Sequence, residues 1–498
     1  MKAHKILPAH PGQLLAAAGK GIALPCGGRR HCGNCAVFVR GALAPPGAKE
    51  QALLQKYTQP PPAGYTRRLA CFCALEGEAE LLLPEGAIAT FKEDAAPPVA
   101  GEGSCGLAVD IGTTTIALEV HRPGQPVAAV HEINRQTAFG ADVLSRIAAS
   151  SQNQHNCVQA QLRDMLARTG VAPAQITHAV TTGNTVMLHL FAGLSPKGMG
   201  AFPFKPESNF GKTQAIAWLP NAEVYLPPCP SAFVGGDIAC GALAAGLLRG
   251  SQAALLVDVG TNGEMLLRTP AGTLACCSVA AGPAFEGAEI SMGMPALPGA
   301  IDWVRAEGGA LRWHCLGEAG QKPVGLCGTG LISALLAFAA LGAVDAAGTI
   351  VEEEDVPWLL WQAEGPALWL PGTDVTITQQ DVRKLQTAKA AVRAGIETLL
   401  HTTGTRPEDV AVLHLAGGFG SFLRPKDAAA LGMLPQDLAA RAIAGGNLAL
   451  RGAAQLLFDL SLRKTLEHRM ADVTEIQLAD SAFFAKSFLQ ALRRLTAE

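Results

Sequence analysis

Charged residues are scarce in this chain, and long hydrophobic runs are absent. Asp, Glu, Lys and Arg make up 16% of the 498 residues and hydrophobic residues 49%, which excludes a disordered chain and indicates large buried cores. The longest largely apolar run, residues 331–344, is shorter than the roughly 20 residues that span a bilayer. It predicts a buried helix, and we expect no membrane partner. Residues 1–24 also lack the pattern of a secretory signal, so the expected location is cytoplasmic.

A net basic excess is missing too. The chain has 39 Lys and Arg against 42 Asp and Glu, a net charge of −3. This balance argues against a nucleic-acid partner, because such surfaces need clustered basic residues. The charge is uneven, however, since residues 1–88 hold 10 Lys and Arg against 5 Asp and Glu. The same segment holds five of the 13 cysteines, a clustering that favours metal ligation over disulfides in a reducing compartment.

Composition divides the chain into three segments, as expected for a length that exceeds one hydrophobic core. Residues 1–88 are rich in cysteine and basic residues. Residues 89–104 are small, polar and rich in Pro and Gly, which predicts a flexible linker. In residues 105–498, short apolar strands alternate with Ala/Leu-rich helical segments, the pattern of an α/β domain.

Three of the cysteines stand close together in the string CGGRRHCGNC, and two more follow at Cys71 and Cys73. An iron–sulfur cluster needs four thiolates that a folded loop can bring to one point, and glycines let the backbone wrap closely around it. Cys26, Cys32 and Cys35 supply three ligands. Either Cys71 or Cys73 could be the fourth, because residues two apart share a face of a strand.

The C-x5-C-x2-C spacing and the string RRLAC that ends at Cys71 resemble the adrenodoxin-like ferredoxins. This resemblance implies a [2Fe-2S] cluster with Cys71 as the fourth ligand, held in a β-grasp fold. A zinc site is the alternative, but zinc ligands favour C-x2–4-C pairs and the second pair here is C-x-C. Only residues 1–9 precede the helical segment 11–20, so one strand of the usual first hairpin is expected to be missing. Three basic residues of the cluster loop either stabilise the reduced cluster or are solvated: Arg29, Arg30 and His31.

A strand–turn–strand pattern occurs twice in the long segment, as GLAVDIGTTTIAL and ALLVDVGTNGEML. The glycine of each turn lets the backbone approach a phosphate, and the following N–H groups and hydroxyls can donate to it. The aspartates, Asp110 and Asp258, would hold Mg²⁺ directly or through water. Two such turns predict two similar lobes, roughly residues 105–250 and 251–498, that face each other across a cleft.

Three further segments have the same character: HLAGGFGS after an apolar strand, and GLCGTGLIS and TGNT at helix starts. These segments resemble motifs of the acetate and sugar kinase, heat-shock chaperone and actin superfamily of ATPases. HLAGGFGS resembles the adenosine motif, GLCGTGLIS and TGNT resemble the connecting motifs, and the two aspartate turns resemble the phosphate motifs. The resemblance implies a duplicated RNase H-like fold that binds ATP. A duplicated fold without nucleotide is the alternative. The implied cofactor-binding residues are Gly112, Thr113, Thr114, Thr115, Gly260, Thr261, Asn262, Gly263, Glu264, Gly328, Gly330, Gly417, Gly418 and Gly420.

The sequence does not decide the roles of two acidic residues. Asp237, in VGGD, begins an apparent helix, and could orient an attacking water or bind Mg²⁺, or could simply cap the helix. We count it with Asp110 and Asp258 as a candidate catalytic residue. Glu286, in AAGPAFEGA, could reach the nucleotide or merely stabilise its loop.

The chain as a whole resembles the reductive activators of corrinoid proteins. The resemblance covers the cysteine loop, both aspartate turns, AAGPAFEGA, LAGGFG and residues 380–391. It implies ATP-dependent electron transfer from the [2Fe-2S] cluster to a corrinoid protein in the Co(II) state, which restores Co(I). The electron would come from an external donor, and the ATPase domain would form a homodimer. Longer members carry an extra small domain before the ATPase, where this chain has only the linker.

Other functions fit parts of the pattern. An ATP-driven electron donor to another low-potential metalloenzyme is the nearest, although such activators typically bridge two subunits with one [4Fe-4S] cluster, which this cysteine pattern does not suit. A small-molecule kinase with a redox-sensing domain should carry a dedicated substrate pocket. An ATP-switched binding protein should show negligible turnover.

Overall fold

The protein is described here from a computed structural model, which covers residues 3–7, 30, 35–55, 60–82 and 104–497. Within the last range it omits residues 124, 141, 319, 354–355 and 421. In the ranges it covers, no helix is both long and apolar enough to cross a bilayer. Several sequence predictions lie outside the described residues: the ligands Cys26 and Cys32, the loop residues Arg29 and His31, the helical segment 11–20 and nearly all of the linker 89–104.

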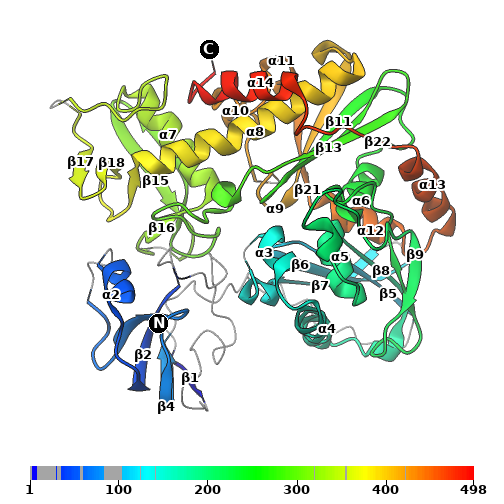
Figure 1. Ribbon diagram of the computed structural model, residues 1–498, viewed down its shortest axis with the longest axis horizontal. Coiled ribbons are helices and arrows are strands. Elements are labelled where there is room, and N and C mark those ends of the chain that lie inside the picture. The colour runs from blue at the N-terminus through cyan, green and yellow to red at the C-terminus, as the bar shows by residue number, and fades with distance from the viewer. Residues whose placement is uncertain are drawn as a thin grey trace.

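The N-terminal segment forms a four-stranded sheet (Figure 1). The strand order is β1-β4-β2-β3, and all neighbours are antiparallel. Among the residues described before position 30, residues 3–7 form strand β1. The missing strand of the first hairpin stays a prediction. The elements are β1 (Ala3–Leu7), β2 (Ala36–Leu43), α2 (Ala48–Leu54), β3 (Thr66–Leu69) and β4 (Leu75–Leu82).

A buried ion pair ties helix α2 to strand β3. The Arg68 guanidinium donates two hydrogen bonds of 2.9 Å to the Glu50 carboxylate, and Leu69 N donates a third to the same carboxylate. Both side chains are almost fully buried. Such a bidentate geometry offsets the cost of burying two charges. The pair therefore fixes the start of the segment that runs into Cys71.

The first six-stranded sheet has the order β7-β6-β5-β8-β10-β9. Its strands β5, β6 and β7 form an antiparallel meander, and β8 and β10 follow in parallel on the other side of β5. Residues of β5 are nearly all buried, as expected for a central strand covered on both faces. The bounds are β5 (Cys105–Ile111), β6 (Thr115–Arg122), β7 (Gln125–Ile133), β8 (Ile176–Gly183), β9 (Lys212–Ala215) and β10 (Glu223–Leu226).

The second six-stranded sheet, read from its other end, is β22-β13-β12-β11-β20-β21. Here too a meander of three antiparallel strands, β11 to β13, is followed by two parallel strands, β20 and β21. The two sheets thus share one strand order around β5 and β11. The bounds are β11 (Ala253–Val259), β12 (Gly263–Arg268), β13 (Leu274–Val279), β20 (Val410–Ala416), β21 (Ala442–Gly446) and β22 (Thr474–Glu475).

Helices α6 and α12 lie between the two sheets (Figure 1). They pack against each other, and their apolar residues share one core cluster with residues of both sheets, including Ala108 and Leu256. The expected lobe boundary at residue 250 separates the sheets but not the helices, because α12 contacts β5, β6 and β8 of the first sheet. The two helices of this layer are α6 (Gly236–Ala244) and α12 (Leu448–Gln455). Other helices of this part of the molecule are α3 (Val143–Ala148), α4 (Ser151–Arg168), α5 (Thr185–Ala192) and α13 (Leu460–Ala471).

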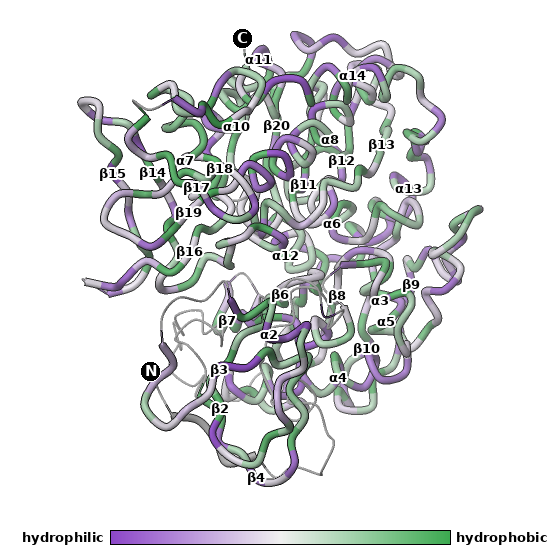
Figure 2. Tube along the Cα trace, turned by 60° about the vertical axis from the view of Figure 1, so that its left-hand side comes forward, coloured by the Kyte–Doolittle hydropathy of each residue, from purple (hydrophilic) through white to green (hydrophobic). Residues whose placement is uncertain are grey.

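The far side of the second sheet is covered by the long helix α8, against which α14 packs (Figure 1). Hydrophobic residues are concentrated in the strands of both sheets (Figure 2). The apolar run 331–344 lies mostly in the buried helix α7, which confirms that prediction. The helices are α7 (Gly328–Ala340), α8 (Gln379–Thr403), α9 (Gly417–Gly420), α10 (Pro425–Ala430), α11 (Gln436–Ala439) and α14 (Ala482–Leu492).

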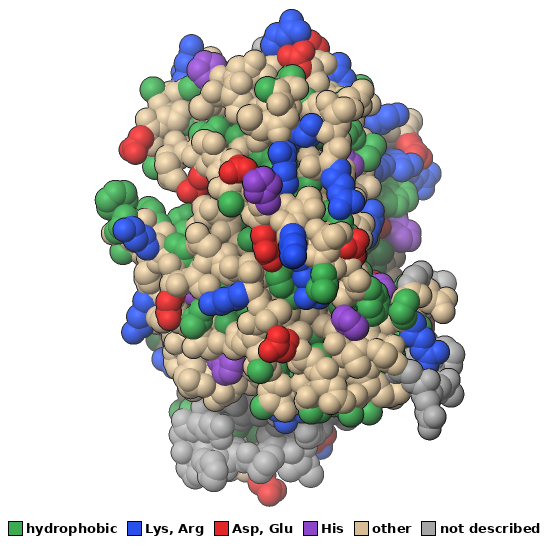
Figure 3. Space-filling model, turned by 90° about the vertical axis from the view of Figure 1, so that its right-hand side faces the viewer, with side chains coloured by type: hydrophobic (Ala, Val, Ile, Leu, Met, Phe, Trp, Pro, Cys, Tyr) green, Lys and Arg blue, Asp and Glu red, His purple; other side chains and the backbone are tan. Residues whose placement is uncertain are grey.

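Two small three-stranded sheets complete the second half. The first packs against α7 and holds β14 (Ala300–Glu307), β15 (Ala310–Cys315) and β16 (Gly325–Leu326). The second holds β17 (Leu359–Gln362), β18 (Gly365–Trp369) and β19 (Thr376–Thr378). On the face shown in Figure 3, acidic and basic side chains are interspersed, so that face carries no large field of one sign.

Candidate functional site

The two aspartate turns lie at equivalent ends of the central strands of the two sheets. Asp110 is near the end of β5 and Asp258 near the end of β11. Each turn is closed by a glycine N–H: Gly112 N donates to Thr115 O and Gly260 N donates to Asn262 O, both at 2.9 Å. The predicted strand–turn–strand pattern is thereby confirmed in both places.

Five carboxylates belong to one electrostatic group around these turns. Burial raises the pKa of Asp110 to about 6. Burial and the neighbouring Asp110 raise the pKa of Asp237 to about 7. Burial and repulsion from Asp237 and Asp110 also raise the pKa values of Asp258 and Glu264 well above the usual range. Mutual repulsion of this kind is relieved by a cation, and carboxylate oxygens are the ligand type that Mg²⁺ prefers. Among the described residues, however, no three of these side chains converge into a ready-made metal site. Glu286, whose pKa is also raised by burial, is the fifth member.

The three aspartates of this group are largely buried, but none of them is fully enclosed. Asp110, Asp237 and Asp258 each keep part of their surface exposed, as a ligand site requires. Asp237 is the second residue of α6, whose N-cap is Gly235. The helix-capping interpretation of Asp237 is therefore wrong, and its side chain belongs to the acidic group.

Asn447 joins the C-terminal part of the chain to the first turn. Its Nδ2 donates to Asp110 Oδ2 at 2.9 Å, and its Oδ1 accepts from Leu450 N as the N-cap of α12. The hydrogen bond favours the charged form of Asp110 and so opposes the effect of burial on its pKa. Sequence reasoning missed Asn447, because GGN before a helix carries no signal of a partner 337 residues away.

The adenosine-type segment abuts the second turn. Strand β20 is parallel to β11, with Ala416 in register with Asp258. Gly417 follows with φ of +90°, and a Cβ there would lie 2.3 Å from Asp258 Oδ1. Only glycine fits this close approach. By contrast, a Cβ at Gly418 would meet nothing within 4 Å, so that side of the turn is open.

Not every predicted glycine borders the open side. A Cβ at Gly328 would lie 1.8 Å from Phe285 O, and one at Gly330 would lie 1.9 Å from Ile301 O. Gly263 faces Val279 in the core. These glycines allow close packing at the start of α7 and within the second sheet.

Threonines and asparagines line the turns. Asn184 Nδ2, at the N-cap of α5, donates to Thr113 Oγ1 at 3.1 Å. Thr182, at the end of β8, has a buried hydroxyl without a hydrogen-bond partner. Helix α5 thus brings TGNT beside the first turn, as its resemblance to a connecting motif implied.

Arg146 is a cation that sequence reasoning missed. Its side chain is fully buried, and Nε donates to Gly140 O at 2.9 Å while Nη2 donates to Thr113 O. Burial lowers the pKa of Arg146 to about 10, and the negative charge of Glu286 opposes that effect. An arginine in a short helix gives no hint in the sequence that its side chain reaches a phosphate-type turn.

The cysteines of the N-terminal sheet converge. Cys35 Sγ and Cys71 Sγ are 3.3 Å apart and both are buried. Cys73 is also buried, and burial raises its pKa to about 11. Arg30 Nε donates to Cys71 O at 3.0 Å, whereas Arg29 and His31 lie outside the described residues. Two thiols at this separation fit the thiolate ligation that a cluster needs. No group of three metal-ligating side chains occurs among the residues the structure describes.

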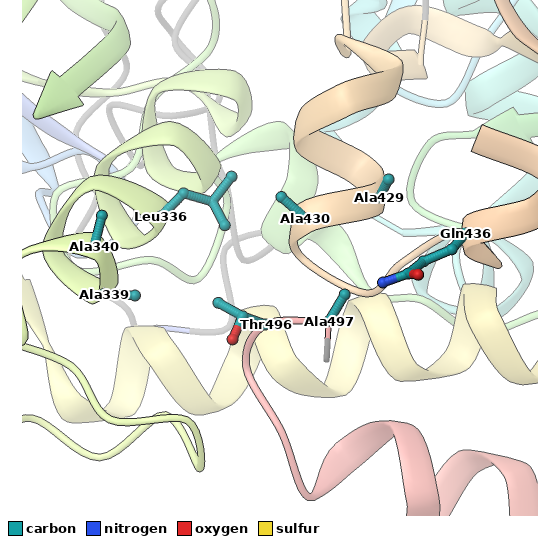
Figure 4. Close-up of a pocket in the computed structure, with 8 residues that line it drawn as sticks. All are labelled: Leu336, Ala339, Ala340, Ala429, Ala430, Gln436, Thr496 and Ala497. Atoms are coloured by element: carbon teal, nitrogen blue, oxygen red, sulfur yellow. The ribbon is translucent and has the colours of Figure 1, made fainter. Parts of the chain in front are cut away.

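A pocket of about 550 Å³ lies elsewhere, between α7, α10 and the C-terminal segment (Figure 4). Its lining is mostly alanine, with the amide of Gln436 and the hydroxyl of Thr496 as polar groups. None of the described residues that line it is charged. The candidate site is therefore the acidic group between the two turns, where carboxylates and hydroxyls are present.

Comparison with known proteins agrees with this geometry. Residues 105–250 match the family model described as the RACo middle region, and residues 252–497 match the C-terminal domain of RACo, the ASKHA domain. A solved structure, "Reductive activator for corrinoid,iron-sulfur protein", superimposes with a TM-score of 0.72 at 26% identity, covering 97% of this chain and 95% of that one.

Two curated relatives are similar in sequence. The corrinoid activation enzyme RamQ of Eubacterium limosum is 28% identical over 77% of this chain and 69% of its own length. The [Co(II) methylated amine-specific corrinoid protein] reductase of Methanosarcina barkeri is 29% identical over 65% of this chain and 62% of its own length. With two adjacent family models and a structural match over nearly its full length, the chain belongs to the reductive activators of corrinoid proteins.

Proposed function

We propose that this protein uses ATP to drive the one-electron reduction of a corrinoid protein from the Co(II) to the Co(I) state. The observation that carries the proposal is the meeting of two phosphate-type turns around one acidic group, in a chain whose N-terminal sheet brings two cysteines together. The names of the relatives, an activation enzyme and a Co(II) corrinoid protein reductase, support the choice of partner.

The domain assignment remains as the sequence predicts it. Residues 1–88 form the ferredoxin-like domain, 89–104 the linker and 105–498 a duplicated, two-lobed RNase H-like ATPase. The shared strand order of the two six-stranded sheets supports the duplication. An external electron donor, a homodimer through the ATPase domain and a cytoplasmic location also stay predictions.

The N-terminal cysteines are the proposed ligands of the redox cluster. Cys26, Cys32, Cys35 and Cys71 would hold a [2Fe-2S] cluster, and the short distance between Cys35 and Cys71 favours Cys71 over Cys73. When bound, the cluster supplies one electron at a time. The buried Arg68–Glu50 pair holds β3 in place, and the turn after β3 sets the position of Cys71. Arg30, bonded to the Cys71 carbonyl, brings positive charge beside the ligand.

The ATPase residues have separate roles. Asp110 and Asp258 would hold Mg²⁺, and the hydroxyls of Thr113, Thr114 and Thr261 would donate to phosphate oxygens. Asp237 would orient the attacking water, because its side chain lies at the start of α6 and stays partly exposed beside the two turns. When bound, Mg-ATP supplies the free energy that an uphill electron transfer requires.

The test is anaerobic. The purified, reduced protein is mixed with ATP and a Co(II) corrinoid protein, while phosphate release and the absorbance of Co(I) are followed. We expect the corrinoid protein to stimulate hydrolysis and Co(I) to form only with ATP. A cluster that reduces normally, without stimulated hydrolysis or Co(I) across several corrinoid proteins, would disprove the proposal.

A further inference from the structure

The side chain of Glu286 lies between the two phosphate-type turns and contacts both. Thr114 Oγ1, from the first turn, donates to Glu286 Oε2. Thr261 Oγ1, from the second turn, donates to Glu286 Oε1 at 3.1 Å. Glu286 itself belongs to neither turn, since it lies in the short helical segment Pro283–Glu286 after β13. One carboxylate thus links turns from both six-stranded sheets.

Arg146 acts on the Glu286 carboxylate through its charge and not through a direct hydrogen bond. The guanidinium of Arg146 is fully buried and attracts the Glu286 carboxylate. The hydrogen bonds of this guanidinium go to the neutral acceptors Gly140 O, Thr113 O and Met187 Sδ. Its charge is therefore compensated by nearby carboxylates, of which Glu286 contributes most and Asp142 next.

The surroundings of Glu286 are those that a phosphate group needs. Two hydroxyl donors and a guanidinium are the groups that recognise phosphate oxygens in proteins. The turns that supply the hydroxyls are the two that resemble phosphate motifs. The Glu286 carboxylate, whose one negative charge is shared by two oxygens, therefore accepts from the two hydroxyls that a terminal phosphate of ATP would also use.

The Glu286 segment is also tied to the adenosine-type segment. The rings of Phe285 and Phe419 stack with centroids 5.0 Å apart and an interplanar angle of 12°. Both rings are buried, and Gly328 packs between the two segments. A shift of Glu286 must therefore be accommodated next to the segment that would hold the nucleoside.

We infer that Glu286 competes with a phosphate of ATP for the hydroxyls of Thr114 and Thr261. The inference rests on the proposed binding of ATP. Glu286 is then a positioning residue that sets nucleotide affinity, because binding must break its two hydrogen bonds and overcome its repulsion of the phosphate. It differs from a catalytic base, which would set the rate of hydrolysis and not the affinity.

The experiment compares Glu286→Gln with Glu289→Gln in the full-length protein. Glu289 is an exposed acid three positions along the same loop, so it controls for the loss of one negative charge. Equilibrium titration with Mg-ATP gives the dissociation constant, and phosphate release at saturating ATP gives the turnover number. For E286Q we expect a dissociation constant about tenfold lower, while the turnover number shows separately whether hydrolysis changes. E289Q should match the parent in both.

Several outcomes would overturn the inference. A turnover number that falls while affinity stays constant would make Glu286 a hydrolytic residue. Weaker binding, or no change in either quantity, would show that Glu286 does not compete with phosphate. Glu286→Asp, whose shorter side chain cannot reach both threonines, should also tighten binding, and it serves if E286Q fails to fold. If the parent itself binds no ATP, the proposed function fails and not this inference alone.

Discussion

Gly417 is the residue at which the adenosine-type segment meets the second aspartate turn. Its φ of +90° costs a side-chain-bearing residue about 1–2 kcal/mol, and a Cβ there would overlap Asp258 Oδ1. We expect Gly417→Ala to weaken ATP binding at least tenfold by displacing Asp258. Gly418→Ala, where a Cβ meets open space, is the matched control and should bind ATP like the parent. Equal effects of the two substitutions in an ATP titration would contradict the close approach at Gly417.

Cys71 and Cys73 make a similar matched pair. Cys71 Sγ lies 3.3 Å from Cys35 Sγ, whereas the Cys73 thiol is buried beside Arg68 with its pKa raised to about 11. We expect Cys71→Ala to lose the visible absorbance and half or more of the iron after anaerobic reconstitution. Cys73→Ala should keep both. The reverse result would reassign the fourth ligand.

Lys389 gives a pH dependence that is independent of the site. It is buried in α8, and burial together with Arg393 and Arg494 lowers its pKa from 10.5 to about 8. The folded protein thus binds this proton less tightly than the unfolded chain does. The destabilisation is full below pH 8 and disappears as the pH rises toward 10.5.

We therefore expect Lys389→Met to raise the free energy of unfolding by about 2 kcal/mol at pH 7. The gain should shrink at pH 9.5. Lys464→Met, at an exposed position of α13, is the control and should show no such trend. Urea unfolding at both pH values measures the difference. A gain of equal size at both would mean that packing, and not the charge, is responsible.

At the scale of elements, helix α13 is held to the first sheet although it lies in the chain between strands β21 and β22 of the second sheet. Tyr225 Oη, from β10, donates to Glu467 Oε1 at 2.9 Å, and the Arg463 guanidinium stacks on the Tyr225 ring at 4.7 Å. Together with α12, this contact spans both halves of the molecule. It belongs to the layer that keeps Asn447 beside Asp110.

Removing that contact should loosen the layer. We expect Tyr225→Phe to lower the free energy of unfolding by about 1–2 kcal/mol, because a buried hydrogen bond to a carboxylate is lost. Tyr65→Phe removes a bond of similar length, to Glu80 in the more exposed N-terminal sheet, and should cost less than about 1 kcal/mol. Chemical unfolding compares the two. A larger loss for Tyr65→Phe would show that α13 contributes little to the fold.

The sequence predicts those elements whose pattern is local. An apolar strand, an Asp-x-Gly-Thr turn and a second strand are written in consecutive residues, and both copies occur in the structure. Bonds between distant segments leave no such trace: Asn447 lies 337 residues from Asp110, and Glu286 lies 172 from Thr114.

The choice between Cys71 and Cys73 stayed open in the sequence for a different physical reason. The argument that residues two apart share a face holds within a strand, but β3 ends at Leu69. Phe72 N and Cys73 N both donate to Leu69 O, so the two cysteines lie in and after a turn. A turn points their side chains in different directions, which strand periodicity does not describe.

At the scale of the molecule, two chemistries occupy separate regions of one chain. The converging cysteines lie in the N-terminal sheet, and the acidic group lies between the two six-stranded sheets. Among the described residues, the cysteine contact and the acidic group are built by different segments of the chain. If ATP drives the electron transfer, each region should be able to do its own part while the other is inactive.

Two substitutions separate these parts. We expect Asp258→Asn to take up and reduce its cluster like the parent but to hydrolyse ATP at least 100-fold more slowly, because a proposed Mg²⁺ ligand is lost. Cys71→Ala should do the opposite, hydrolysing ATP at close to the parent rate without holding a complete cluster. Neither should form Co(I) from a Co(II) corrinoid protein, as followed by absorbance under anaerobic conditions. Co(I) formation by the Asp258 variant at the parent rate would show that hydrolysis does not drive the electron, and the acidic group would then need another role. Loss of hydrolysis in the Cys71 variant, with its ATPase region still folded, would show instead that the ATPase senses the cluster, so that coupling runs in both directions.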